Sequence, residues 1–240
     1  MKKYRIPQLG LAVVLMLGAC QTGTKYKVDE ATVADLPLSE RGELLMWQAN
    51  RDRAQGEMQK ADADAHTTEH AIVTAEAERG QAKLAMKKLE SDLDLAKPRR
   101  DMARQGRLQA ELDVAAIAKQ AADTRVDWCK QQHEVYQAQA EAAKTNTQLS
   151  EARVEQARAH LAERHGRRPS GRYSVGNFDE QALRAERTND KERQNVATQT
   201  SLSAAIGQQY AAQLGLYSQR RNQLQNFTSS YTPPGYISTP

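Results

Sequence analysis

The stretch AIVTAEAERGQAKLAMKKLESDLDLA, residues 71–96, decides the predicted fold of this chain. Its apolar side chains recur at alternating spacings of three and four residues, and the positions between them are mainly polar or charged. This spacing gives a helix one continuous apolar face, and over many turns it indicates a coiled-coil seam with about 3.5 residues per turn. The seam starts earlier in the chain and comprises Leu44, Trp47, Arg51, Ala54, Met58, Ala61, Ala65, Thr68, Ile72, Ala75, Arg79, Ala82, Met86, Leu89, Leu93 and Ala96.

A second seam with the same spacing follows after a short interruption. It comprises Ala110, Val114, Ile117, Ala121, Thr124, Trp128, Gln131, Val135, Ala138, Ala142, Thr145, Leu149 and Ala152. Both seams are rich in Ala, so the helices would pack closely and each layer would stabilise the fold only modestly. A solvated single helix is the alternative that such an Ala-rich pattern leaves open.

The interruption, AKPRRDMARQGR at residues 96–107, contains Pro98. A proline removes one intrahelical hydrogen bond and clashes with the preceding turn. We therefore predict a long antiparallel hairpin over residues 39–165 that turns back near residues 97–107, with Ser39 as a candidate N-cap. A kink in one continuous helix is the competing interpretation, since the heptad phase survives across the break.

The segment HGRRPSGRYSVGN, residues 165–177, is rich in Gly and turn residues and ends the hairpin. Asn177 and Glu180 resemble a capping box for a third helix over residues 179–227, which leaves a basic Gly/Pro loop at 166–178. Three helices of similar length predict an all-α fold, an elongated three-helix bundle or coiled coil. Residues 228–240 contain Pro and aromatic residues; we expect a disordered tail, and an extended docking segment is the alternative.

The N-terminus carries Lys2, Lys3 and Arg5 ahead of a short apolar block over residues 9–17. A membrane-spanning helix needs about 20 apolar residues, so this block is too short and is typical of a cleavable signal peptide over residues 1–19. Without that segment, which holds three basic and no acidic residues, the formal net charge falls from +4 to +1. We therefore expect no nucleic-acid partner, because binding to phosphates requires a clustered positive excess.

Residues 17–20 read Leu-Gly-Ala-Cys. This motif resembles the lipobox of bacterial lipoproteins, which implies diacylation of Cys20 and cleavage just before it. The alternative is a signal peptide that is cut elsewhere and contains a Cys by chance. Gln21, where lipoproteins that stay in the inner membrane often have Asp, implies sorting to the periplasmic side of the outer membrane; retention in the inner membrane is the alternative. Residues 20–38 would then be a flexible tether between lipid and rod.

One further motif raises the question of catalysis. His66 and His70 belong to HTTEH, the H-x-x-E-H pattern of inverted zinc peptidases, in which two His one turn apart hold the metal. A catalytic zinc also needs a third protein ligand and an enclosed cleft, which a thin rod does not offer, so we expect no enzyme and no cofactor.

Cys129 is the only Cys besides Cys20. We expect it to be a small hydrophobe in a helix seam, and a cross-chain disulfide is the alternative.

The basic loop contains Arg167, Arg168 and Arg172, which could contact an anionic glycan or lipid headgroup, although a solvated loop has the same composition. From these features we expect a lipid-anchored periplasmic scaffold, spacer or accessory subunit of a cell-envelope assembly. Its partners would be the membrane, reached through the lipid, and envelope proteins or further copies of this chain. Binding to peptidoglycan or another envelope surface is the alternative function, and a zinc metallopeptidase is a remote one.

Overall fold

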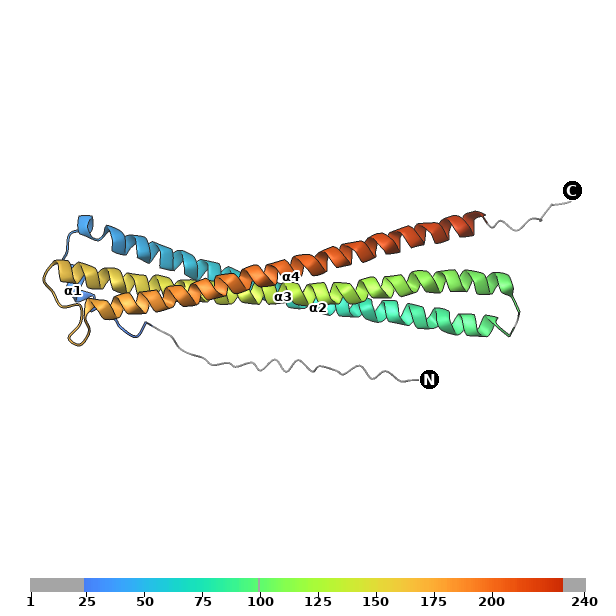
Figure 1. Cartoon of the computed structure of the whole chain (residues 1–240), viewed down its shortest axis with the longest axis horizontal. Helices are drawn as coiled ribbons and strands as arrows, with labels where there is room; N and C mark the ends of the chain where they lie inside the picture. The colour runs from blue at the N-terminus through green and yellow to red at the C-terminus, as the bar shows by residue number, and fades with distance from the viewer. Residues whose placement is uncertain (1–23, 99, 231–240) are drawn as a thin grey trace.

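The computed structural model describes residues 24–98 and 100–230, in which every regular element is helical. Three long helices, α2 (Gly42–Ala96), α3 (Met102–Arg164) and α4 (Val175–Ser230), form an elongated rod (Figure 1). Two short elements precede them: α1 (Ala31–Ala34) and a 3₁₀ helix (Leu38–Glu40). At 1.5 Å per residue, α3 is about 95 Å long. The all-α prediction is confirmed.

α2 and α3 form an antiparallel hairpin, and a single kinked helix is excluded. α2 ends at Ala96 and α3 begins at Met102. Within the short turn between them Arg100 adopts a left-handed φ of 53°. Asp101 then caps α3, because its carboxylate accepts the backbone N–H of Arg104 at 3.0 Å. The turn is shorter than the segment 97–107 that the sequence suggested.

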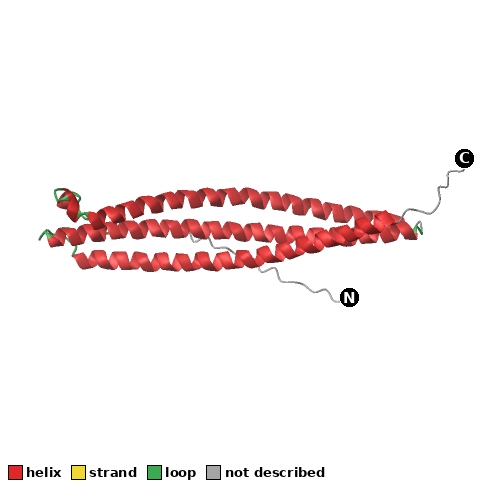
Figure 2. Ribbon diagram, turned by 90° about the horizontal axis from the view of Figure 1, so that it is seen from above, coloured by secondary structure: helices red, strands yellow, loops and turns green. Residues whose placement is uncertain are grey.

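α3 is the central helix of the rod. It packs against α2 and against α4 along much of its length (Figures 1 and 2). In α2, every predicted seam residue except Arg79 is buried or half-buried. The predicted seam of α3 is also buried or half-buried throughout, but α3 buries further residues outside it, among them Val126 and Cys129. A helix with neighbours on two sides needs two packed faces, and one heptad seam describes only one of them.

Contacts of individual residues show which face of α3 meets which neighbour. The seam residue Trp128 stacks on Tyr210 of α4, with ring centroids 5.6 Å apart. By contrast, Val126 and Cys129 pack against Ala75 of α2. At these positions the predicted α3 seam faces α4 rather than its hairpin partner.

Polar pairs between helices fix the register of this packing. Thr145 of α3 donates to Oδ1 of Asn189 of α4 at 3.3 Å, and both residues are buried. Gln131 donates to Oε1 of Gln199 at 2.7 Å. Because an unpaired buried polar group is costly, sliding one helix along the other would break these pairs at a penalty, so they favour a single register.

α4 begins earlier than the sequence suggested, and Asn177 as its N-cap is wrong. The helix starts at Val175, directly after Ser174. Oδ1 of Asn177 accepts the backbone N–H of Ser174 at 3.0 Å and its hydroxyl at 3.1 Å. Asn177 therefore occupies the third helical position and completes a capping arrangement that Ser174 begins. At its other end α4 reaches Ser230, so the predicted tail lies outside the described residues from residue 231 onward.

Residues 24–41, which we call the strap, differ from the flexible tether expected over residues 20–38. Val28, Val33 and Leu36 are buried against the end of the rod where α3 ends and α4 begins. Their spacing follows no helical period, so their apolar character gave no sign of packing, yet burying such side chains stabilises the strap by about 1.5–3 kcal/mol each. Residues 1–23, which include the predicted signal peptide, Cys20 and Gln21, lie outside the described residues.

Candidate functional site

The most elaborate set of contacts in the described chain lies at the strapped end of the rod. Two apolar clusters hold the strap there. Val33 and Leu36 pack with Leu44 of α2 and with Val154, Ala157 and Leu161 of α3. Val28 packs with Ala159 of α3 and with Val175 and Phe178 of α4. The strap therefore joins the ends of all three long helices.

Aromatic rings extend the second cluster. The rings of Tyr26 and Tyr173 have centroids 4.5 Å apart, and Tyr26 meets Phe178 edge-on at 6.0 Å. Phe178 is fully buried. Aromatic side chains bury large areas and prefer such tilted contacts, so this trio is an anchor point for the strap on the loop and on α4.

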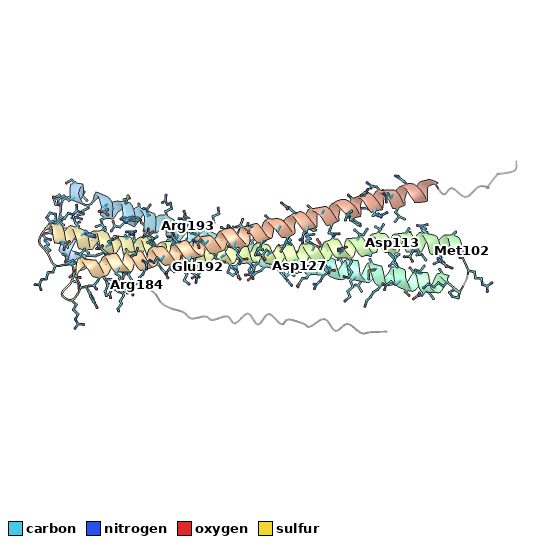
Figure 3. All side chains as sticks on the ribbon, in the orientation of Figure 1. Met102, Asp113, Asp127, Arg184, Glu192 and Arg193 are labelled. Atoms are coloured by element: carbon cyan, nitrogen blue, oxygen red, sulfur yellow. The ribbon has the colours of Figure 1, made fainter. Side chains whose placement is uncertain are left out.

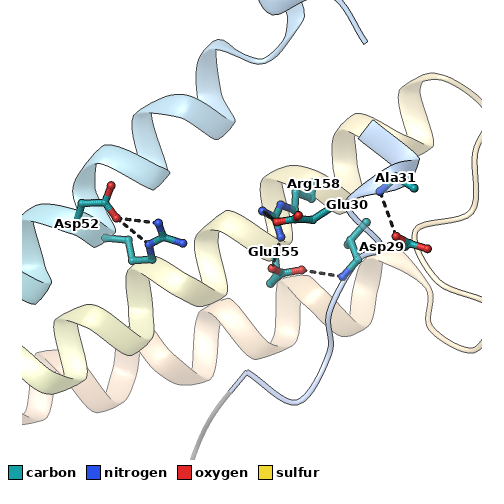
Figure 4. A network of polar contacts seen from close by, with 8 residues as sticks. Asp29, Glu30, Ala31, Asp52, Glu155 and Arg158 are labelled. Atoms are coloured by element: carbon teal, nitrogen blue, oxygen red, sulfur yellow. Dashed lines mark hydrogen bonds and ion pairs between the residues drawn. The ribbon is translucent and has the colours of Figure 1, made fainter. Parts of the chain in front are cut away.

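A buried carboxylate binds the backbone of the strap. Glu155 of α3 is 7% exposed, and its Oε2 accepts the backbone N–H of Val28 at 2.7 Å. Its Oε1 accepts from Arg158 at 2.8 Å, and Arg158 also donates to Glu30 of the strap at 2.9 Å (Figure 4). Sequence reasoning missed Glu155, because a Glu–Arg pair three residues apart on a helix usually lies on a solvated face.

A second ion pair fastens the strap to the interhelix loop. Arg167 donates to both carboxylate oxygens of Asp35, at 2.5 and 2.7 Å, and to the carbonyl oxygen of Thr32 at 2.7 Å. The hydrogen bond from Arg167 lowers the pKa of Asp35 to about 2, and the same contact raises the pKa of Arg167. Bidentate Arg–carboxylate pairs are among the stronger surface contacts.

The three arginines of the basic loop therefore have different surroundings. Arg167 is engaged by the strap, whereas Arg168 and Arg172 are exposed. Of the three arginines that were predicted to bind an anionic ligand, only Arg168 and Arg172 remain available, because the charge of Arg167 is matched by Asp35.

A histidine–carboxylate pair joins α3 to α4 nearby. Asp179 accepts at Oδ1 from Gln156 at 2.7 Å and lies 2.8 Å from Nε2 of His160. Partial burial opposes ionisation of Asp179, but the hydrogen bonds from Gln156 and His160 outweigh it, so its pKa lies below the usual value. The pair thus reinforces the α3–α4 contact beside the aromatic cluster.

The HTTEH motif lies elsewhere, on α2. The side chain of His66 is 80% exposed and approaches only Glu69, at 3.6 Å, and His70 is exposed as well. In residues 24–98 and 100–230, no three His, Cys, Asp or Glu side chains are grouped closely enough to hold a metal ion. The described part of the chain offers this motif no third ligand.

Cys129 lies inside the α2–α3 contact with Ala75 and Val126, and the half-buried Ile72 packs against them. Burial raises the pKa of its thiol. A cross-chain disulfide needs an accessible thiolate, so this environment favours a role as a small interior hydrophobe.

Comparison of the chain with known proteins gives no match to a protein-family model, to a curated protein or to a solved structure. None of the described helices is apolar over a stretch long enough to span a membrane. Any functional conclusion therefore depends on the residues and the geometry of this chain alone.

Proposed function

We propose that the protein is a lipid-anchored helical scaffold of a bacterial cell envelope, attached to the membrane through acylated Cys20. The observation that carries this proposal is the stretch Leu-Gly-Ala-Cys at residues 17–20, which follows a basic start and a short apolar block. A diacylglyceryl group and an N-linked acyl chain together supply enough hydrocarbon for stable anchoring.

The architecture supports a role that depends on contact. α3 alone extends about 95 Å, so the rod offers long helical faces to partners. The strap begins four positions after Cys20 and is bound to α3 by Glu155 and to the loop by Arg167. A force on the anchor would therefore reach the rod through these contacts.

The proposed location is the periplasmic side of the outer membrane, on the basis of Gln21. The proposed partners are envelope proteins or further copies of this chain. An extended helical surface suits both, because helices bind one another through long apolar stripes.

The anchor is tested by expressing the full chain in bacterial cells as wild type, as Cys20→Ala and as the control Cys129→Ser. We expect mass spectrometry to find an acylated Cys20 at the N-terminus of the mature wild type and of the control. The Cys20→Ala variant should remain uncleaved and should lose its acyl chains. A mature wild-type protein with an unmodified Cys20 would refute the proposal.

The scaffold role is tested by crosslinking in the same cells, followed by purification from membranes. A defined set of envelope proteins, or defined oligomers of the chain, should be recovered with wild type and lost with Cys20→Ala. Recovery of the same partners in the absence of the anchor would contradict a role that depends on lipid positioning.

A second function, binding to anionic cell-wall glycan, is favoured by the exposure of Arg168 and Arg172. Sedimentation with purified peptidoglycan should then fall in the double variant Arg168→Ala/Arg172→Ala. The matched control is Arg220→Ala/Arg221→Ala, which removes two exposed arginines from α4. Equal sedimentation of the two variants would exclude the loop as a binding site.

A further inference from the structure

The strap leaves the rod on its flank and not at its end. Thr24 lines a groove of about 500 Å³ together with Gln148 of α3 and Thr188 of α4. Gln148 precedes Arg164, the last residue of α3, by about 24 Å along the helix axis, and it lies about 70 Å from Met102 at the other end. The point where the described chain begins therefore lies on the flank of the rod, in the part nearer its strapped end.

The reach from this point to Cys20 is short. Thr24 is four positions after Cys20, and a fully extended chain covers at most about 3.6 Å per position, or about 14 Å in total. The residues that line this groove lie between about 8 Å (Glu180 of α4) and about 24 Å (Gln148 of α3) from the strapped ends of their helices. A rod standing on this end would therefore hold Thr24 at a height comparable to this reach or beyond it. If the rod stood on its opposite end, the chain between Cys20 and Thr24 would have to span about 70 Å.

The strap cannot lengthen this reach without losing its own contacts. The backbone N–H of Tyr26 donates to Gln181 at 3.0 Å, and that of Val28 donates to the buried Glu155 at 2.7 Å. Release of these residues would also expose Val28 and the rings packed around it. With the strap bound, this short reach favours a rod axis that lies closer to the membrane plane than to the membrane normal.

The flank beside Thr24 carries exposed basic side chains. Arg184, Arg187 and Lys191 of α4 are spaced three and four residues apart, so they share one helix face, and all three are exposed. Arg184 lines the same groove as Thr24 and Lys25 and is marked in Figure 3. The acidic residues on this part of α4 are Asp179, Glu180, Glu186, Asp190 and Glu192. Glu180 pairs with Arg184, Asp179 and Glu186 pair with side chains of α3, and Asp190 is exposed.

We propose that the rod lies along the membrane, with the face of α4 that carries Arg184, Arg187 and Lys191 against anionic phospholipid headgroups. The inference rests on the lipid anchor proposed above. Two independent features favour anionic headgroups on this face: the short chain between Cys20 and the strap, and the positive charge beside Thr24, where the strap begins. Each basic residue close to an anionic surface adds to the attraction between the rod and the membrane.

The test measures the distance of two positions from a membrane to which residue 20 is fixed. The full chain with Cys129→Ser is coupled through Cys20 to a maleimide lipid in phosphatidylglycerol-containing vesicles. A fluorescent amino acid replaces either Arg104, near the α2–α3 turn, or Arg164, at the strapped end, and energy transfer to acceptor lipids is recorded. Both positions should lie within about 25 Å of the surface, because the rod is only two to three helices thick.

Strong transfer from position 164 and negligible transfer from position 104 would show an upright rod and overturn the proposal. The maleimide lipid holds residue 20 whether or not cells acylate it. A failure of acylation in cells would therefore appear only in the mass-spectrometric experiment, and a failure of the flat posture only in this one.

The headgroup contact is tested separately by inserting a 20-residue Gly/Ser linker after Gly23, which frees the rod to stand. On phosphatidylglycerol vesicles the rod should stay flat, and transfer from position 104 should be retained. It should be lost on pure phosphatidylcholine and in the variant Arg184→Gln/Arg187→Gln/Lys191→Gln, but not in the control Lys83→Gln/Lys87→Gln/Lys88→Gln. Equal transfer in the two triple variants would overturn the assignment of this face.

Discussion

The two ends of the rod use the same heptad repeat but pack very differently. At the strapped end Phe178, Leu161 and Val154 are buried, and the strap covers them. At the other end Leu84, Leu95 and Met102 are largely exposed, and no residue of α4 between Ala204 and Asn226 is buried. Figure 1 shows α4 diverging from the hairpin toward this end.

A seam therefore contributes stability in proportion to the number of neighbours that pack around it. An Ala-rich seam between two helices removes little apolar area from water in each layer. Where the strap adds a further layer, large side chains become fully buried and each contributes more. Stability should therefore be concentrated in the strapped end.

The largest expected effect is that of Phe178→Ala. Removing a fully buried Phe should lower the free energy of unfolding by about 3–5 kcal/mol, because it leaves a cavity among the strap, α3 and α4. The matched variant at the other end, Leu84→Ala, should change it by less than about 0.5 kcal/mol, since this side chain is 68% exposed. Urea unfolding of the two variants measures the difference, and similar losses would contradict the comparison.

Glu155→Ala should have the next largest effect. It leaves Arg158 and the backbone N–H of Val28 without their buried acceptor, which should cost about 2–3 kcal/mol. The control, Glu141→Ala, breaks the exposed pair with Lys144 and should cost less than about 1 kcal/mol. Hydrogen exchange should also show lost protection of the Val28 amide in Glu155→Ala, and unchanged protection would contradict the role of Glu155 as a strap anchor.

Two glycines provide a smaller contrast. Gly80→Ala places a Cβ in open space on α2 and should stabilise the protein by about 0.5–1 kcal/mol through helix propensity. Gly207→Ala should stabilise less or destabilise, because its Cβ would lie 3.0 Å from Nε1 of Trp128, whose ring is held against Tyr210. Thermal unfolding should rank Gly80→Ala above Gly207→Ala, and the reverse order would show that α4 is not in close contact with α3 at Trp128.

The smallest expected effect is the pH dependence of the strap. The pKa of Asp35 is lowered from 3.8 to about 2, so its pairing with Arg167 stabilises the strap above pH 4 and is lost as the pH falls toward 2. As the pH falls from 4 to 2, the rate of limited proteolysis of the strap should therefore increase in wild type and in the control Asp94→Asn. Asp35→Asn should lack the part of this increase that comes from the Asp35–Arg167 pair. An identical pH profile for the two variants would contradict a role of this pair in holding the strap.

Sequence periodicity predicted the helices and most of their buried faces. Along α2 it located every seam residue correctly except Arg79, which is exposed. It did not reveal that Trp128 and Gln131 of the second seam face α4, because a heptad pattern shows which residues share a face but not which helix covers it. The start of α4 was misplaced because Asn177 accepts from Ser174 instead of capping the helix itself.

The candidate site was less predictable. Of the basic loop, the sequence indicated Arg167, but its partner Asp35 lies far away in the chain and only the fold brings them together. Glu155 gave no signal, because its burial depends on the strap lying across it.

The helical period, the break at Pro98 and the interhelix loop follow from the amino-acid sequence, because they depend on local backbone preferences and on side chains a few residues apart. The central place of α3 and the binding of the strap to the rod follow only from the assembled fold. Those features depend on contacts between residues that are distant in the chain, such as Val28 with Glu155, whose free energy exists only once the three helices have assembled.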